Sequence, residues 1–320
     1  MRVIMLETID FHVHFWKKEF LSNEFKAMLN NFAIMVNEKN FPNENYTPEK
    51  YLETIEPEKE KHKEFAIRHA VIFPIDYSFT SVKMKISYEA YMKYVINICD
   101  EFSDFFYAFA GPDPRHGSKA LDLLEYTLGQ CDCKGILFTP STGFSFTHPN
   151  IEPMIQIAEK YEVPVVIHDT GVVPRPLQLF TEIYQLDELL SKFDKQSFIF
   201  CPFSQMNTDL MKVAIRHTNH IMADLTGYDS QFVSRKMPEM VFTQFLGMLK
   251  ETFGSEKLLF GSDWPWWELT APAQEWLVYL RKMKIPFIVK PFGFPSLEDE
   301  DKENILANNA YRILKLRPKI

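Results

Sequence analysis

The stretch Thr8-Ile9-Asp10-Phe11-His12-Val13-His14 is the first of a series of short apolar runs, and this series decides the fold. Seven more runs follow, at residues 69–75, 105–110, 135–139, 163–168, 197–201, 220–225 and 257–261. They are rich in β-branched and aromatic residues and are nearly continuous in their apolar character. That pattern is typical of parallel strands that are buried on both faces of a sheet.

Stretches with helical periodicity separate most of these runs. Apolar residues recur three and four positions apart in Ala120-Leu121-Asp122-Leu123-Leu124 and again in Ile151-Glu152-Pro153-Met154-Ile155. Strand and helix alternating eight times predict an α/β protein with a (β/α)8 barrel, known as a TIM barrel. A doubly wound open sheet is the alternative, although the glycine-rich nucleotide motifs that often accompany it are missing. We expect one domain over residues 1–320, with residues 15–66 as a helical insertion near the barrel mouth.

Composition narrows the class of partner. The chain has 320 residues, 46% of them hydrophobic, and a formal net charge of -8, which argues against nucleic acid and anionic membranes as partners. No uncharged apolar run approaches the ~18 residues that a membrane span needs. The four cysteines fit reduced thiols better than a disulfide scaffold. These features predict a cytoplasmic protein that acts on a small molecule.

Three histidines and one aspartate stand at the ends of predicted strands. In a strand, residues two apart share a face, so His12 and His14 can bind one metal ion together. His168 ends the fifth run and Asp263 follows the eighth. Because the carboxyl ends of barrel strands meet at one mouth, these side chains predict a site for zinc or a similar divalent ion. The alternative is that each polar residue only caps its own strand.

At this point the chain resembles the amidohydrolase superfamily, and within it the amidohydrolase 2 branch that includes aminocarboxymuconate semialdehyde decarboxylase. The resemblance covers nearly the whole chain and rests on Ile9 to His14, Gly111-Pro112-Asp113-Pro114, Pro164 to Gly171, Gly261-Ser262-Asp263-Trp264-Pro265 and Asn304 to Leu314. It implies that His12, His14, His168 and Asp263 hold a single metal ion, commonly zinc, with manganese, iron or cobalt as alternatives. It also implies a homodimer as a candidate assembly.

One departure concerns proton transfer. Family members usually end strand six with a histidine, whereas this chain reads Phe200-Cys201-Pro202-Phe203, and the simplest alignment puts Pro202 at that position. Proline cannot transfer a proton, so the usual base is absent or displaced. We therefore predict Asp263 as the proton-transfer group, with Asp169 as a second candidate that could instead orient His168. His116 and His148, in loops after the third and fourth runs, are weaker candidates.

Three residues are predicted to contact substrate. Arg175 lies between two prolines, a stiff setting that would hold its guanidinium ready for a carboxylate. Trp264 and Phe15 are predicted to wall an apolar pocket. With one metal ion, these residues predict a hydrolase that cleaves an ester, lactone or amide bond of a small cyclic or aromatic substrate. A nonoxidative decarboxylase of the same family is the first alternative, and a barrel that has lost catalysis and only binds a ligand is the second.

Overall fold

Eight short parallel strands form the centre of the protein. The computed structural model describes residues 7–36, 38, 41, 45–61, 66–168, 178–201, 208–227, 239–266, 268–269, 273–284, 293 and 296–317. The strands are β1 (Thr8–Val13), β2 (Ile67–Ile72), β3 (Phe106–Ala108), β4 (Ile136–Phe138), β5 (Val165–His168), β6 (Phe198–Cys201), β7 (Ile221–Asp224) and β8 (Leu258–Leu259). Each overlaps a run that the sequence marks as a strand.

The strands close into a barrel. Continuous parallel pairing joins β1 to β3 and, separately, β4 to β8. Backbone hydrogen bonds bridge these parts at both seams: for example, Leu137 N donates to Ala110 O at 2.9 Å, and Phe11 N donates to Phe260 O at 2.9 Å. The predicted (β/α)8 barrel is therefore confirmed, and every strand points its carboxyl end toward the same mouth.

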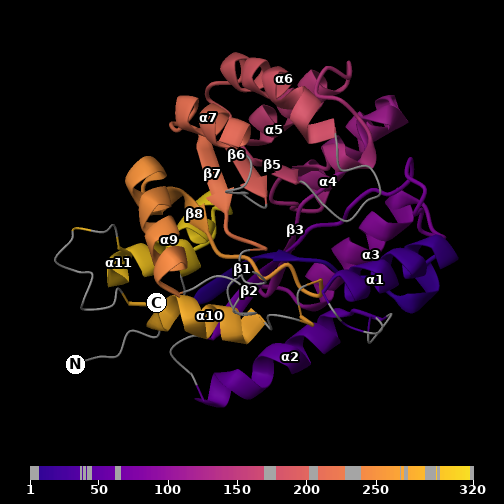
Figure 1. Ribbon diagram of the computed structural model, residues 1–320. Coiled ribbons are helices and arrows are strands. Elements are labelled where there is room, and N and C mark those ends of the chain that lie inside the picture. Colours follow the sequence, from indigo (N-terminus) through magenta and orange to yellow (C-terminus); the bar gives the residue numbers. More distant parts are fainter. Residues whose placement is uncertain are drawn as a thin grey trace.

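Helices surround the barrel (Figure 1). They are α1 (Asn23–Met35), α2 (Pro48–Lys61), α3 (Tyr88–Glu101), α4 (Ser118–Gln130), α5 (Ile151–Tyr161), α6 (Gln178–Lys192), α7 (Thr208–Arg216), α9 (Glu239–Phe253), α10 (Ala273–Lys282), α11 (Asp299–Glu303) and α12 (Asn309–Ile313). Serine side chains cap two of them: Ser22 accepts from Phe25 N at the start of α1, and Ser87 accepts from Ala90 N at the start of α3. No described helix is long and apolar enough to cross a membrane.

The barrel interior is packed with aromatic side chains beneath the mouth. Phe11, Phe73 and Phe109 are fully buried, and their rings meet edge to face with centroids 5.1–5.8 Å apart. Each such pair contributes about 0.5–1.5 kcal/mol beyond the burial of its area. A β-carbon on Gly135 would lie 2.1 Å from the Phe109 ring, so this strand position requires glycine. This packed aromatic cluster lies directly beneath the residues at the strand ends and supports them.

The described part of residues 15–66 includes the α-helices α1 and α2, between β1 and β2. Aromatic side chains join this segment to the barrel. The ring of Trp16 packs on Phe25, Tyr46 and Trp266, and that of Tyr51 packs on Trp264. Helix α2 also runs beside α10 (Figure 1). The segment thus covers the barrel on the side where β1 and β8 meet.

The end of the chain supports β8. After α11 the helix widens into one π-turn (Asn304–Asn308) and continues as α12. Asn309 donates two hydrogen bonds, to Ser255 O at 2.8 Å and to Leu258 O at 2.7 Å. Phe260 N donates to Ile305 O at 3.0 Å. These contacts hold the short β8 in register, and with it the loop that follows.

Candidate metal centre

The four predicted ligands lie around His12 at the carboxyl ends of β1, β5 and β8. Their ligand atoms fall into two overlapping groups, each within 4.8 Å: His12, His14 and Asp263, and His12, His168 and Cys201. His12 Nε2 is the common point: it lies 3.0 Å from His14 Nε2, 2.9 Å from His168 Nε2 and 3.6 Å from Asp263 Oδ1. His14 Nε2 is 3.2 Å from the same carboxylate oxygen. Ligands that surround zinc tetrahedrally at 2.0–2.1 Å are separated from one another by about 3.3–3.4 Å. The spacing around His12 therefore suits a small divalent ion.

Hydrogen bonds on the far side of two imidazoles decide where their protons lie. His12 Nδ1 is 3.0 Å from Asp224 Oδ2, and His14 Nδ1 is 2.6 Å from the carbonyl oxygen of Phe73. Both partners are acceptors, so each Nδ1 carries the proton and each Nε2 of a neutral ring presents a lone pair. When both rings are neutral, two lone pairs thus face each other at 3.0 Å.

The carboxylate oxygen between these lone pairs also has no proton to bind. Asp263 Oδ1 is buried and has no hydrogen-bond donor among the described residues. A cluster of acceptors without donors is unfavourable in a buried place unless a cation lies among them. The donor set, imidazole nitrogen with one carboxylate oxygen, is the kind that zinc and similar ions take. The residues present therefore fit a divalent metal ion.

The surroundings also set the charge on the imidazoles. Burial lowers the pKa of His14, and the neighbouring Asp263 carboxylate only partly offsets it. Burial lowers the pKa of His168 well below its usual value, and the neighbouring His12 and His14 lower it further. The pKa of His12 is raised, because its hydrogen bond with Asp224 and the charge of Asp263 outweigh the effect of burial. His14 and His168 are thus neutral near pH 7, as metal ligands must be.

Asp224, at the end of β7, is a buried carboxylate that the sequence analysis did not single out. Its Oδ2 pairs with His12, and its Oδ1 accepts from Thr226 N at 2.9 Å and Thr226 Oγ1 at 2.6 Å. A β-carbon on Gly261 would lie 2.2 Å from Thr226 Oγ1 and 2.7 Å from the β-carbon of His12. Glycine at 261 is therefore what lets β8 approach this network. The one signal for Asp224 in the sequence was its position as a charged residue inside the otherwise apolar run at 220–225.

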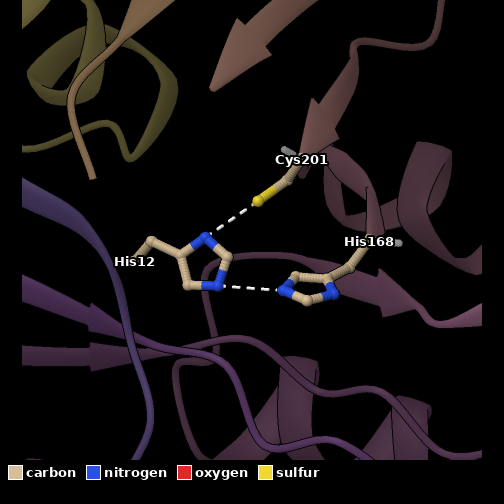
Figure 2. A group of neighbouring side chains, drawn as sticks. All are labelled: His12, His168 and Cys201. Carbon is tan, nitrogen blue, oxygen red and sulfur yellow. Dashed lines mark hydrogen bonds between the residues drawn. The ribbon is translucent and has the colours of Figure 1, made fainter. Parts of the chain in front are cut away.

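Cys201 is the second residue that sequence reasoning missed. Its thiol donates to Asp224 Oδ2 at 3.0 Å, and its sulfur lies 2.8 Å from His12 Nδ1. Figure 2 shows the sulfur at one ring nitrogen of His12 and His168 at the other. One imidazole cannot direct both nitrogens at one ion. When His12 binds through Nε2, Cys201 is therefore outside the ligand set, although His12, His168 and Cys201 also lie within metal-binding distance of one another.

Strand pairing clarifies the position that lacks the family's histidine. His168 on β5 is paired with Cys201 on β6, so Cys201 is level with a predicted metal ligand. Pro202, which the simplest alignment puts at the histidine position, lies outside the described residues, as do Asp169 and Arg175. The roles given to Asp169 and Arg175 stay predictions.

Phe15 and Trp264 are packed into the protein interior. Phe15 is 0% exposed and Trp264 is 1% exposed, and their rings meet at 5.5 Å. Both rings also pack on Tyr51. These contacts hold the loop after β8 in place, and contact of either residue with substrate stays a prediction.

The two loop histidines have other partners. His116 Nε2 is 3.0 Å from Asp76 Oδ2, and the ring packs on Phe79. His148 Nδ1 accepts from Asn150 N at 3.3 Å. Neither joins a metal-binding group within the part of the chain that the structure describes.

Comparisons with known proteins agree with this picture. A family model described as Amidohydrolase matches residues 9–316. A search of curated proteins found no match. Among solved structures, an uncharacterised TIM-barrel protein from Bordetella bronchiseptica is 17% identical, with a TM-score of 0.65 over 97% of this chain and 99% of that one. An amidohydrolase from Burkholderia multivorans with bound zinc is 12% identical, with a TM-score of 0.66 over 97% of this chain and 99% of that one.

A third similar structure is a 5-carboxyvanillate decarboxylase from Novosphingobium aromaticivorans, complexed with manganese and 4-hydroxy-3-methoxy-5-nitrobenzoic acid. It is 13% identical, with a TM-score of 0.58 over 97% of this chain and 96% of that one. At these identities the structural matches show a shared fold.

Proposed function

We propose that this chain, which belongs to the amidohydrolase family, is a hydrolase that binds one divalent metal ion through His12, His14, His168 and Asp263. The observation that carries the proposal is the convergence of two Nε2 atoms, each presenting a lone pair when its ring is neutral, on a buried carboxylate oxygen that no described donor reaches. We propose zinc as the ion, with manganese, iron or cobalt as alternatives. The family is one of enzymes, and its solved relatives include proteins with bound zinc and manganese.

The proposed reaction is cleavage of an ester, lactone or amide bond in a small cyclic or aromatic substrate. A divalent ion at this position supplies Lewis-acid chemistry, polarising a carbonyl oxygen and making water more acidic. Asp263 is the proton-transfer group, because its side chain keeps 16% exposure while His12 and His14 are buried more deeply. Its carboxylate would accept a proton from the attacking water and donate it to the leaving group.

The other residues bind and orient. His14 and His168 stay neutral near pH 7 because their pKa values are lowered, so protons compete weakly for their Nε2 atoms. Asp224 keeps the proton of His12 on Nδ1, away from the metal position. Arg175 is proposed to bind a substrate carboxylate, Asp169 to orient His168 or transfer a proton, and Phe15 and Trp264 to contribute apolar walls.

Nonoxidative decarboxylation is the second candidate. It is supported by the similarity to a decarboxylase along almost the full length of both chains. In that reaction the ion would anchor substrate oxygens, and Asp263 would deliver a proton to the ring carbon as carbon dioxide leaves. We further propose a cytoplasmic enzyme, in keeping with four free cysteines, and a homodimer.

Metal-reconstituted protein assayed with lactones, amides and aromatic carboxylic acids separates these reactions. Hydrolysis releases an acid and no carbon dioxide, whereas decarboxylation releases carbon dioxide. The expected result is activity that a chelator removes and that His14→Ala abolishes. The matched control is His217→Ala, because His217 pairs with Asp187 between α6 and α7. Turnover that survives both chelation and His14→Ala would contradict the proposal.

A further inference from the structure

We infer that Tyr51, which α2 contributes from the segment between β1 and β2, is a positioning residue of the metal centre. Together with Asp10 and Ser262 it forms a buried chain of hydrogen bonds that fixes the place of the Asp263 carboxylate. The inference rests on the proposed metal site and assigns the inserted helix a part in it.

Asp10 is the centre of this chain. It is 0% exposed on β1, two residues before His12. Its Oδ2 accepts from Tyr51 OH at 2.8 Å and from Ser262 Oγ at 2.6 Å. Its Oδ1 accepts from Ser262 N at 2.9 Å and from His12 N at 3.3 Å. One carboxylate thus joins the inserted helix, the first metal-binding strand and the loop after β8.

Asp263 follows Ser262 directly and has a conformation that needs support. Its φ is 53°, in the left-handed region that residues other than glycine rarely adopt. Such a conformation persists only where the surroundings impose it. On one side Ser262 is bound to Asp10 through both its amide and its hydroxyl.

The other side of Asp263 is held from the same strand. His14 N donates to the carbonyl oxygen of Trp264 at 2.7 Å, and Trp264 N donates to Ser262 Oγ at 3.1 Å. Strand β1 therefore supplies two imidazoles and also fixes, on both flanks, the loop that carries the carboxylate. Among these hydrogen bonds, the one from Tyr51 to Asp10 alone comes from outside the barrel strands and their loops.

Tyr51 is placed to hold Asp10 in one orientation. Its side chain is 0% exposed, and its ring packs on Phe15, Phe106 and Trp264 at 5.4–6.0 Å. The ring thus contacts Trp264 while the hydroxyl reaches Asp10. Without the hydroxyl, Asp10 Oδ2 keeps only the Ser262 hydroxyl as a donor among these contacts, and the carboxylate loses its hydrogen bond to the inserted helix. The loop of Asp263 would then be held less firmly.

The test uses the full chain loaded with cobalt, whose visible absorption reports the geometry and identity of its ligands. Tyr51→Phe should shift or weaken the cobalt bands and reduce affinity for the ion about tenfold, as removal of outer hydrogen-bond partners does at other sites. The matched control is Tyr91→Phe, which removes another buried hydroxyl, the donor to Phe15 O at 2.6 Å. Both variants should lose thermal stability, and only Tyr51→Phe should change the spectrum.

Ser262→Ala provides a second variant, and it should alter the cobalt bands in the same way if Tyr51→Phe fails to fold. Wild-type bands retained in both variants would overturn the positioning role while leaving the metal site intact. A wild-type protein that takes up no cobalt would overturn the proposed metal site, and the inference with it.

Discussion

Replacing Asp224 with Asn should weaken metal binding although Asp224 is not expected to touch the ion. The carboxylate accepts from His12 Nδ1 at 3.0 Å, from the Cys201 thiol at 3.0 Å, and from two donors of Thr226. It thereby fixes the tautomer of His12 and increases the basicity of Nε2. The amide of Asn is neutral and can offer an acceptor to only one side of this network.

The size of the effect follows from these contacts. Loss of such an outer partner typically reduces metal affinity by about 10–100-fold, or about 1.4–2.8 kcal/mol. The amide NH2 group must also face either Thr226 N or His12 Nδ1, and in both orientations a donor would meet a donor. An unsatisfied buried donor costs about 1–3 kcal/mol, so the free energy of unfolding should fall by a similar amount.

Competition with a chromogenic chelator measures the affinity, and thermal unfolding of the metal-free protein measures the stability. Asp187→Asn is the matched control, because Asp187 on α6 also pairs with a histidine, His217 at 2.7 Å, which follows α7. The control should retain wild-type affinity. Asp224→Asn with an affinity within about twofold of wild type would refute the argument that this carboxylate tunes His12.

Two further predictions concern stability. Gly261→Ala should lower the free energy of unfolding by about 1–3 kcal/mol, because its β-carbon would lie 2.2 Å from Thr226 Oγ1; an unchanged melting temperature would show that the network yields easily. The second prediction concerns the pair of His116 and Asp76. The hydrogen bond with Asp76 raises the pKa of His116. Burial alone would raise the pKa of Asp76, but hydrogen bonds from His116 and Ser78 lower it. Stabilisation by this pair should be largest between their ordinary values of 3.8 and 6.5, and be lost as pH rises through the raised pKa of His116 or falls through the lowered pKa of Asp76. The difference in unfolding free energy between wild type and His116→Gln, measured against pH, checks this, and a difference that does not shrink above neutral pH would contradict it.

The barrel could be predicted from the sequence because parallel strands buried on both faces produce nearly continuous apolar runs. The run at 197–201 became β6 (Phe198–Cys201), and the run at 220–225 became β7 (Ile221–Asp224). Closure of the barrel could not be read from the runs themselves. It depends on contacts such as Phe11 N to Phe260 O, between residues at opposite ends of the chain.

The proximity of the predicted metal ligands could be read from the sequence, because a strand places His12 and His14 on one face and the barrel then gathers the strand ends. Asp10, Asp224 and Cys201 were not predicted, since each stands inside a predicted strand and acts through hydrogen bonds to distant residues. Even Cys201, next to the position that lacks the family's histidine, shows its relation to His12 only once the register of β5 and β6 is known.

The central claim is that His12, His14, His168 and Asp263 hold one metal ion, and elemental analysis of the purified, untreated protein tests it most directly. We expect about one equivalent of a single divalent metal per chain in the wild type. The double variant His12→Ala, His14→Ala should contain almost none. A wild-type protein that is metal-free and takes up no added zinc, manganese, iron or cobalt would contradict the claim, and so would a double variant with undiminished metal content.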